Sequence, residues 1–382
     1  MTQALPLPHG LAVTSADAAT ARRRIVFLGT AHDNGGSSIL AGALAQAMRA
    51  AGHEVEEWYL FGSAATATGP VRVLHDGARS RSPLVLARLF ARVVKDLAAR
   101  RADAVFGLQS LSNLMAGFGG ALAGVRHRIA THHNPAPALN RVLMALDALA
   151  GRCGAYTRMV ACAREVGASY ARPGSAYARK LAVIANGQQP PRLVPRRQAR
   201  AALGLPADGV VIGQIGRLCA QKNQSFTLDR LAEWPEATLL LVGSGPDAAM
   251  LRERIRARGL DRRVRLITVL DHARIGEFYS AVDLVLFPSR FEGLSLAAIE
   301  ALHAGTPLLC SDIASFREMF EAAPGLREQI VLPLDAPDRW TQRARDIIGD
   351  AALRARIAAD CAQLAPAFSF EAMARRYLAL ID

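Results

Sequence analysis

Short apolar runs alternate with longer amphipathic segments along most of the chain, which is the pattern of an α/β protein. In the first half the pattern predicts a strand at Arg24–Leu28, a helix at Ser37–Ala51 and a second strand at Val55–Leu60. Gly35 and Gly36 lie between the first strand and the helix. A strand, a glycine loop, a helix and another strand form the building block of nucleotide-binding folds. The motif G-x-G-x-x-G is absent here, so a dinucleotide is not indicated.

Residues 104–125 carry no charge, which raises the question of a membrane span. The stretch nevertheless contains Gln109, Asn113 and several glycines. It divides into a predicted strand at Ala104–Leu108 and a predicted helix at Asn113–Ala123. A buried strand and helix explain the stretch better than a transmembrane segment.

The segment Leu84–Arg101 is predicted to be a basic amphipathic helix, with Leu and Val on one face and Arg and Lys on the other. Two interpretations are open: a core helix with a solvated charged face, which we favour, and a helix that faces a membrane. The strand predicted at Arg128–Thr131 then leads into His132 and His133. Ligands of α/β folds bind at the carboxyl ends of parallel strands, so one of these histidines is a candidate site residue.

The alternation restarts in the second half, where strands are predicted at Val210–Ile215, Thr238–Val242 and Leu284–Phe287. A segment rich in Pro and Arg separates the halves and is predicted to be a linker. The expected organisation is a flexible leader (1–21), an N-terminal domain (22–187), the linker (188–199), a C-terminal domain (200–366) and a final helix (367–382).

Glu292 and Glu300 flank a predicted helix start after the strand Leu284–Phe287. Ser295 is the predicted N-cap, and Gly305 is the predicted end of the helix. The free N–H groups at such a helix start attract an anion such as phosphate, whereas ionised carboxylates accept hydrogen bonds from hydroxyl groups. The combination indicates a ligand that carries both phosphate and sugar hydroxyls.

Arg217 and Lys222 follow the strand Val210–Ile215, beside another predicted helix start. Two cations at this spacing can hold a diphosphate, the Arg as a planar fork and the Lys as a point charge. We expect them to form the wall of a donor pocket opposite Glu292 and Glu300.

These motifs resemble retaining glycosyltransferases with the GT-B architecture, in particular glycosyltransferase family 4, the glycosyl transferases group 1 enzymes. Glu292 and Glu300 match the E-x7-E motif of that family. Further matching segments run along residues 24–380, and they are Gly35-Gly36, Val183-Ile184-Ala185-Asn186-Gly187, Gly216-Arg217-Leu218, Gly243-Ser244-Gly245-Pro246, Ala304-Gly305-Thr306-Pro307 and Phe316-Arg317-Glu318. The resemblance implies two Rossmann-like domains with doubly wound parallel sheets, a cleft between them, and a C-terminal helix that crosses back to the first domain.

The resemblance also implies an activity: transfer of a hexosyl or N-acetylhexosaminyl group from a nucleoside-diphosphate sugar to a glycan or lipid-linked acceptor, in lipopolysaccharide, capsule or exopolysaccharide synthesis. By the same resemblance, His133 and Glu292 contact the transferred sugar, Arg217 and Lys222 neutralise the diphosphate, and Glu300 binds the ribose. The remaining implied donor-binding residues are Gly36, Gly243, Gly293, Leu294 and Ser295. No cofactor or metal is implied, and no D-x-D triplet occurs in the chain.

Two positions depart from the family pattern. Ser295 stands where the family usually has the second glycine of E-G-F-G, and Thr268 follows the strand Val264–Ile267 where a glycine is usual. A UDP-linked or GDP-linked donor therefore cannot be chosen from the sequence. The best register with the family selects His133, but the residues themselves leave both His132 and His133 open.

The basic character of the chain belongs to its first half. Residues 1–200 contain 25 Lys and Arg against 10 Asp and Glu, whereas residues 201–382 contain 21 against 23. This asymmetry predicts peripheral contact of the N-terminal half with an anionic membrane, although an Arg-rich genome would also raise the total. We expect a cytoplasmic protein, with the cytoplasmic face of the inner membrane as its candidate docking surface.

The five cysteines form no C-x-x-C pair, which agrees with reduced core residues in the cytoplasm. Two other functions are open: a GT-B sugar-nucleotide epimerase, and a non-catalytic protein that binds nucleotides or nucleic acid. Nucleic acid is disfavoured as a partner, because aromatic residues make up only 6% of the chain and do not alternate with basic ones.

Overall fold

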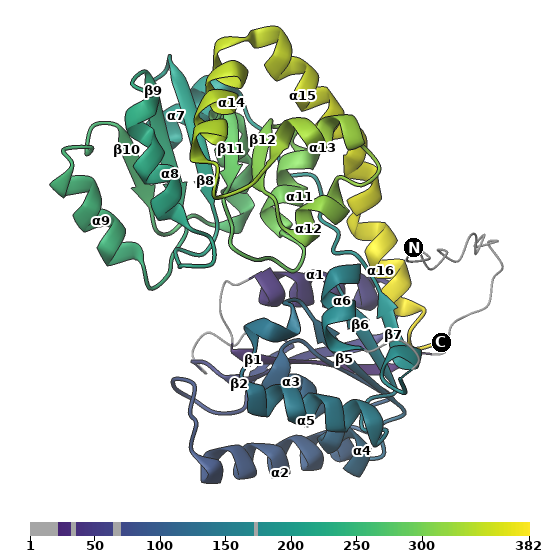
Figure 1. Ribbon diagram of the computed structural model, residues 1–382. Helices are drawn as coiled ribbons and strands as arrows, with labels where there is room; N and C mark the ends of the chain where they lie inside the picture. The colour runs from purple at the N-terminus through teal and green to yellow at the C-terminus, as the bar shows by residue number, and fades with distance from the viewer. Residues whose placement is uncertain (1–21, 32–35, 64–69, 172–174) are drawn as a thin grey trace.

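The computed structural model describes residues 22–31, 36–63, 70–171 and 175–382. They form two α/β domains, one above the other in Figure 1. The predicted leader at 1–21 and part of the first glycine loop lie outside the described residues.

The N-terminal domain is built on a parallel sheet of seven strands in the order β3-β2-β1-β4-β5-β6-β7. Its central strands are buried almost without interruption, as expected for a sheet with helices on both faces. The strands are β1 (Arg24–Ala31), β2 (Glu54–Phe61), β3 (Val71–Val73), β4 (Ala104–Gly107), β5 (His127–His132), β6 (Arg158–Ala161) and β7 (Leu181–Val183).

The helices of this domain cover both faces of the sheet (Figure 1). They are α1 (Gly36–Ala50), α2 (Pro83–Ala99), α3 (Ser110–Leu114), the π-helical turn η2 (Met115–Gly119), α4 (Gly120–Leu122), η3 (Ala136–Ala138), α5 (Arg141–Arg152), α6 (Arg164–Tyr170) and η4 (Ala178–Lys180).

The helix predicted at Asn113–Ala123 begins earlier than expected and is not uniform. α3 starts at Ser110 because the side chains of Gln109 and Ser112 cap each other's backbone N–H groups. The helix then widens into η2, where Gly117 packs so closely on Tyr156 that a Cβ would lie 2.5 Å from the ring. The polar residues between the predicted strand and the predicted helix therefore start the helix. No helix in the described part of the chain is long and apolar enough to cross a bilayer.

The C-terminal domain contains a parallel sheet of six strands in the order β10-β9-β8-β11-β12-β13. Three predicted strands, 210–215, 264–267 and 284–287, have the observed bounds. The strands are β8 (Val210–Ile215), β9 (Ala237–Val242), β10 (Val264–Ile267), β11 (Leu284–Phe287), β12 (Leu308–Ser311) and β13 (Val331–Leu332).

The helices of this domain are α7 (Arg196–Leu203), α8 (Gln224–Arg230), η5 (Leu231–Glu233), α9 (Ala248–Ala257), η6 (His272–Arg274), α10 (Ile275–Ala281), α11 (Leu296–His303), α12 (Ala314–Met319), α13 (Pro324–Ile330), α14 (Pro337–Gly349), α15 (Ala351–Leu364), η7 (Ala365–Phe368) and α16 (Phe370–Leu378).

Two arginines, one in the predicted linker and one directly after it, have a structural role in this domain. α7 begins at Arg196, inside the range predicted as linker. Both Arg196 and the fully buried Arg200 pair with the carboxylate of Asp283, which lies just before β11. The end of the linker range is therefore a packed helix whose position is fixed by a buried charge cluster.

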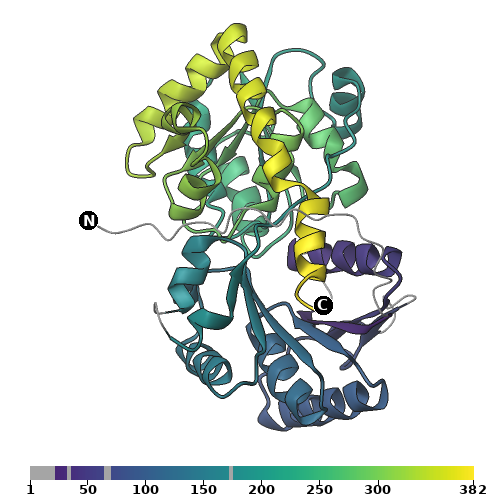
Figure 2. The same cartoon turned by 90° about the vertical axis from the view of Figure 1, so that its right-hand side faces the viewer.

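The last helix returns to the N-terminal domain, as predicted. α16 crosses the junction between the domains (Figure 2) and buries Phe370, Met373 and Tyr377 in the same cluster as Ile25 of β1. At the crossing, Gly187 lies against the backbone of Ser369, and a Cβ on Gly187 would lie 2.3 Å from the Ser369 carbonyl oxygen. The two domains are thus joined by two crossings of the chain.

Candidate functional site

Glu292 and Glu300 lie at the carboxyl edge of the C-terminal sheet. β11 ends at Phe287, and α11 begins at Leu296, so Glu292 is in the connecting loop and Glu300 is in the helix, as predicted. Both side chains are buried. Ionisable groups at this depth need partners, and each of the two carboxylates has found a different one.

Glu292 is paired with Lys222. The Lys222 Nζ lies 2.5 Å from Oε1 of Glu292, which also accepts a hydrogen bond of 2.7 Å from the Ser289 hydroxyl. The sequence had placed these two charges on opposite walls of a pocket, and the structure brings them into contact. The reason is topological: β8 and β11 are neighbours in the sheet, so the loops that follow them run side by side.

Backbone contacts hold those two loops together. The Arg290 amide donates to the Gln221 carbonyl at 2.8 Å, and the Gln221 side-chain amide donates to the Phe291 carbonyl at 3.0 Å. Arg217, in the same loop as Lys222, is exposed, and its guanidinium makes no hydrogen bond or ion pair with the residues that the structure describes. The site thus contains one cation paired with a carboxylate and one that is open to a ligand.

Glu300 contacts Tyr279 of α10. The Tyr279 hydroxyl lies 2.9 Å from Oε2 of Glu300 and 2.8 Å from the Ala297 carbonyl. Burial raises the pKa of Glu300 to about 7, against the lowering effect of the Tyr279 hydrogen bond. The single proton of the Tyr279 hydroxyl cannot be donated to both oxygens. If Glu300 is protonated, it donates to the Tyr279 oxygen while the Tyr279 hydroxyl donates to the Ala297 carbonyl, so that the carboxyl, the hydroxyl and the carbonyl are all hydrogen-bonded.

The start of α11 contains an unsatisfied hydroxyl. Ser295 occupies the predicted N-cap position, but its side chain makes no capping hydrogen bond. Its Oγ is buried and has no hydrogen-bond partner in the part of the chain that the structure describes. The prediction that this side chain caps the helix is wrong in this respect, and its hydroxyl and the first N–H groups of α11 are available to a ligand.

The glycine after β9 has a packing role. Gly243 has φ of +143°, and a Cβ there would lie 2.0 Å from the carbonyl oxygen of Gly216, in the loop after β8. The close approach of these two loops is sufficient to require a glycine at 243, so its predicted donor contact is not needed to explain the residue.

His132 and His133 are separated by the structure. His132 is buried in a polar cluster, where the Tyr177 hydroxyl lies 2.9 Å from its Nε2 and donates in turn to Asp147 at 2.5 Å. His133 lies beyond the strand end, at the junction with the C-terminal domain. A Cβ on Gly293 would lie only 1.9 Å from the His133 carbonyl oxygen. His133 is therefore the histidine that adjoins the loop of Glu292.

The hydrogen bonds of Thr131 fix the tautomer of His133. The Thr131 hydroxyl donates to the Gly107 carbonyl at 2.7 Å, so towards Nε2 of His133, 3.1 Å away, it acts as an acceptor. The proton is therefore assigned to Nε2, and Nδ1 is an acceptor. Part of the ring surface is open, yet the surrounding protein and the neighbouring His132 lower the pKa of His133 to about 4, so the ring is neutral at pH 7.

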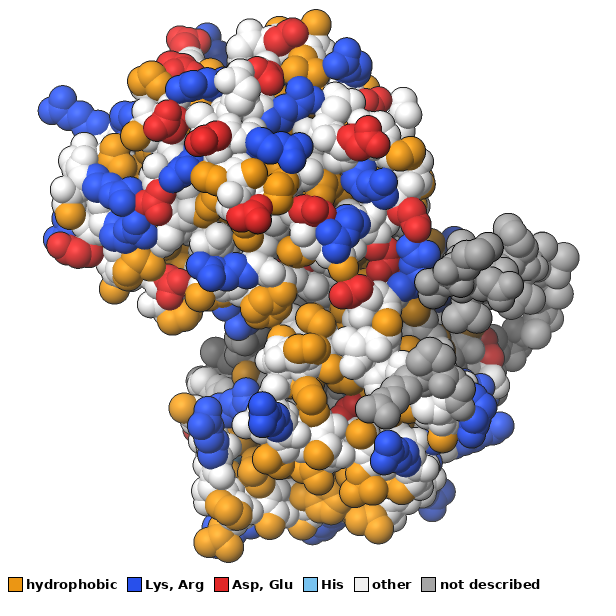
Figure 3. Space-filling view, viewed as in Figure 1, with side chains coloured by type: hydrophobic (Ala, Val, Ile, Leu, Met, Phe, Trp, Pro, Cys, Tyr) orange, Lys and Arg blue, Asp and Glu red, His pale blue; other side chains and the backbone are white. Residues whose placement is uncertain are grey.

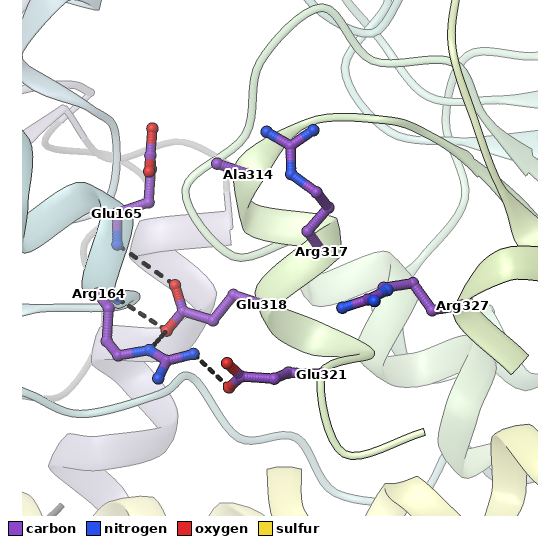
Figure 4. A pocket seen from close by; sticks show the side chains of 7 residues that line it. All are labelled: Arg164, Glu165, Ala314, Arg317, Glu318, Glu321 and Arg327. Carbon is purple, nitrogen blue, oxygen red and sulfur yellow. Dashed lines mark hydrogen bonds and ion pairs between the residues drawn. The ribbon is translucent and has the colours of Figure 1, made fainter. Parts of the chain in front are cut away.

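A second interdomain contact joins α6 to α12 (Figure 4). The backbone N–H groups of Arg164 and Glu165, which begin α6, donate to the carboxylate of Glu318 at 2.8 and 3.3 Å. The Arg164 guanidinium also pairs with Glu318 and with Glu321. These groups line a pocket of about 340 Å³ that contains none of the predicted site residues. Three of its charged residues, Arg164, Glu318 and Glu321, are paired across the domains, so we regard it as part of the junction.

Some predicted residues stay untested by this geometry, and other residues were missed. Gly36 is the first residue of α1, but the loop before it lies outside the described residues. Sequence reasoning did not select Tyr279 or Thr131. Residues two apart on a strand share a face, which is the signal that could have linked Thr131 with His133. Among the described residues, no group of three or more His, Cys, Asp or Glu side chains is placed to hold a metal ion.

Comparison with solved structures decides the fold. Sucrose-phosphate synthase from Thermosynechococcus elongatus superimposes with a TM-score of 0.81, covering 94% of this chain and 98% of the other at 20% identity. The fold is GT-B. HepE from Anabaena in complex with UDP-glucose also superimposes on the GT-B fold of this chain, with a TM-score of 0.77 over 93% of this chain and 98% of the other, at 20% identity.

Sequence comparison places the family match in the C-terminal half. Residues 195–361 match the family described as "Glycosyl transferases group 1". The D-inositol 3-phosphate glycosyltransferase of Jonesia denitrificans is 30% identical over 220 residues, which cover 53% of this chain and 51% of that protein. The lipopolysaccharide core biosynthesis mannosyltransferase LpsB of Rhizobium meliloti is 31% identical over 149 residues, or 36% of this chain and 42% of that protein. The chain thus spans about half the length, or less, of these curated relatives.

Proposed function

We propose that this chain is a glycosyltransferase that moves a hexosyl or N-acetylhexosaminyl group from a nucleoside-diphosphate sugar to a glycan or lipid-linked acceptor, with retention at the anomeric carbon. The observation that carries the proposal is the convergence of Lys222, Glu292 and the start of α11 at one sheet edge, with His133 on the other side of the junction. The family match of residues 195–361 covers the donor side of this arrangement.

Charge balance suggests how the donor side works. In the reaction, the bond between the anomeric carbon and the diphosphate oxygen breaks, and its electron pair leaves with the diphosphate. Lys222 has three N–H donors, so it can keep its contact with Glu292 and still donate to a phosphate oxygen. Arg217 supplies a second, uncommitted cation for the developing charge. No metal enters this proposal, which leaves metal independence as a prediction.

The acceptor hydroxyl forms the new bond to the anomeric carbon, and its proton passes to an oxygen of the departing diphosphate. Glu292, oriented by Lys222 and Ser289, would accept from hydroxyls of the transferred sugar. Nδ1 of His133 would accept from another hydroxyl. The hydroxyl of Ser295 and the N–H groups of Gly293 and Leu294 would donate to phosphate or sugar, and Glu300 would contact the ribose.

Similar proteins support an acceptor in surface glycan synthesis. HepE, a structural neighbour, binds UDP-glucose, and LpsB acts in lipopolysaccharide core biosynthesis. We propose a UDP- or GDP-linked donor, an acceptor of the lipopolysaccharide, capsule or exopolysaccharide type, and a location on the cytoplasmic face of the inner membrane.

The donor site can be tested by calorimetric titration with UDP-, GDP- and ADP-sugars. The wild type should bind one class of donor, and Lys222→Met or Arg217→Gln should weaken binding of that donor about tenfold or more, because each removes a charge-assisted contact worth about 1.5–3 kcal/mol. Arg262→Gln is the matched control, since this exposed arginine precedes β10 at the opposite edge of the sheet. Unchanged affinity in both site variants would refute the assignment.

Product analysis separates the remaining functions. Consumption of the donor without an acceptor, with an epimerised nucleotide sugar as product, would identify an epimerase. Salt-dependent RNA binding with no affinity for any nucleotide sugar would identify a binding protein.

A further inference from the structure

Helix α5 exposes an apolar stripe that the core does not use. Val142, Leu146 and Leu149 are 65%, 40% and 51% exposed, and their spacing of four and three residues places them on one face of the helix. The opposite face is already packed, since Asp147 and Ala150 are buried. Helix α5 therefore exposes apolar side chains to solvent in addition to those it packs against the core. Core packing does not explain this exposed stripe.

Leu122 of α4 extends the stripe at one end of α5. It is 70% exposed. The guanidinium of Arg128 donates to the Val125 carbonyl after α4 and to the Gly154 and Ala155 carbonyls after α5, which holds the two loops together. Figure 3 shows hydrophobic side chains gathered over the lower part of the N-terminal domain, where Figure 1 places α2, α4 and α5.

Cations surround this apolar surface, and no exposed carboxylate accompanies them. Arg126, Arg141 and Arg152 are exposed in and beside α4 and α5. All residues from 83 to 152 are described, and each of their three carboxylates already has a partner within the domain. Asp96 pairs with Arg72, Asp103 accepts from the Arg24 backbone N–H, and Asp147 accepts from Tyr156 and Tyr177.

The α2 helix, which the sequence favoured as a core helix, is a core helix. Its residues Leu89, Val93 and Leu97 are buried against the sheet, so its apolar face is unavailable for a membrane. Its exposed cations Arg88 and Lys95 add only positive charge to this side of the domain. α2 does expose Leu84 (71%) in its first turn, but the three exposed apolar residues that share one helix face belong to α5.

We propose that the α5 face, defined as Val142, Leu146, Leu149 and Leu122 with the flanking Arg126, Arg141 and Arg152, docks on an anionic lipid bilayer. The apolar side chains would enter the boundary between headgroups and acyl chains, and the arginines would lie at the level of the phosphates. A second copy of the chain fits this surface poorly, because a symmetric contact would bring the same cations together.

The topology gives docking a consequence for the acceptor. β5 ends at His132, and α5 begins at Arg141, so the amino end of α5 lies at the sheet edge where His133 is found. A bilayer on the α5 face would therefore present a lipid-linked acceptor near the proposed site. This consequence rests on the proposed function, whereas the docking itself does not.

Vesicle flotation of the full chain tests the proposal. Wild-type protein should float with vesicles of phosphatidylcholine and phosphatidylglycerol and much less with phosphatidylcholine alone. The combined variant Val142→Ser/Leu146→Ser/Leu149→Ser should lose about tenfold or more in affinity for the anionic vesicles. The pair Arg141→Gln/Arg152→Gln should lose about fivefold per cation, and this loss should shrink at high salt.

A matched control lies on the other domain, where Val269→Ser/Arg262→Gln replaces one exposed apolar residue and one exposed cation. This control should float like the wild type. The proposal is overturned if the wild type ignores anionic vesicles, if the serine variant floats like the control, or if sedimentation without lipid shows that the stripe holds a dimer together. Titration of the serine variant with nucleotide sugars distinguishes membrane docking from the proposed transferase function. If the variant no longer floats but still binds the donor, the substitutions have affected the α5 face and not the donor site.

Discussion

The carbonyl oxygen of His133 occupies the place where Gly293 would carry a side chain: a Cβ there would lie 1.9 Å away. His133 directly follows β5 of the N-terminal sheet, and Gly293 follows Glu292 in the C-terminal domain. The absence of a side chain at 293 is therefore what allows the two halves of the proposed site to touch.

Replacing Gly293 by Ala should separate these halves. A methyl group cannot fit against the His133 backbone, so the loop or the whole domain must move by an ångström or more, and misplacement on this scale lowers kcat/KM about 100-fold. Transfer kinetics and small-angle scattering measure the effect. Gly325→Ala is the control, because a Cβ there meets no atom within 4 Å. Full activity in Gly293→Ala would mean that the observed contact is not part of the working enzyme.

Removing the Thr131 hydroxyl should affect His133 through its tautomer. Thr131→Val keeps the shape of the side chain but removes the acceptor for Nε2–H, so the ring can adopt the other tautomer and lose Nδ1 as an acceptor. We expect kcat/KM to fall about tenfold, the value of one hydrogen bond to the donor sugar. Thr131→Ser should restore most of the activity. If Ser and Val behave alike, the hydroxyl has no part in positioning His133.

Glu300 should make stability depend on pH in a defined direction. Its folded-state pKa of about 7 lies above the ordinary value of 4.5, so the folded protein binds the proton more tightly than the unfolded chain. The stabilisation is full below about pH 4.5 and is lost as the pH rises to about 7, by up to roughly 3 kcal/mol. Glu300→Gln removes this dependence.

Urea unfolding of wild type and Glu300→Gln across this range checks the prediction. The lowered pKa of His133 produces the opposite slope in both proteins, so only the difference between the two curves is informative. That difference should shift in favour of the variant as the pH rises. Parallel curves would show that Glu300 titrates normally.

Loss of Glu318 should loosen the junction. This residue caps the first N–H groups of α6 from the other domain, and Ala163 at the N-cap position provides no side-chain cap. Glu318→Ala should cost about 1 kcal/mol of unfolding free energy and increase the radius of gyration in solution. The exposed Glu328 on α13 provides the control Glu328→Ala. Equal scattering curves for the two variants would exclude a role for Glu318 in holding the domains together.

Local patterns were enough to predict the strands of the site. β11 has the predicted bounds because it is a continuous apolar run closed by Pro288, and β8 because it is a mostly apolar run, interrupted by Gln214, that is closed by Gly216. The same reasoning placed Glu292 in a loop and Glu300 in a helix. Such features depend only on neighbouring residues and on the burial of both sheet faces.

Contacts between distant segments could not be predicted in this way. Lys222 and Glu292 are 70 residues apart, and Arg164 and Glu318 are 154 apart, and their meeting depends on which strands are neighbours and how the domains face each other. The apolar face of α2 shows the same limit: its periodicity is equally compatible with a core and a membrane, and only its packing distinguishes them.

The return of α16 determines when the first domain can be completed during synthesis. Phe370, Met373 and Tyr377 complete a core cluster that includes Ile25, Phe27 and Leu40, which the ribosome makes hundreds of residues earlier. Until α16 emerges, that apolar surface over β1 and α1 stays uncovered and open to chaperones or aggregation. The first domain to be made is thus the last to be finished, and truncation before residue 370 should harm the N-terminal domain more than the domain next to the cut.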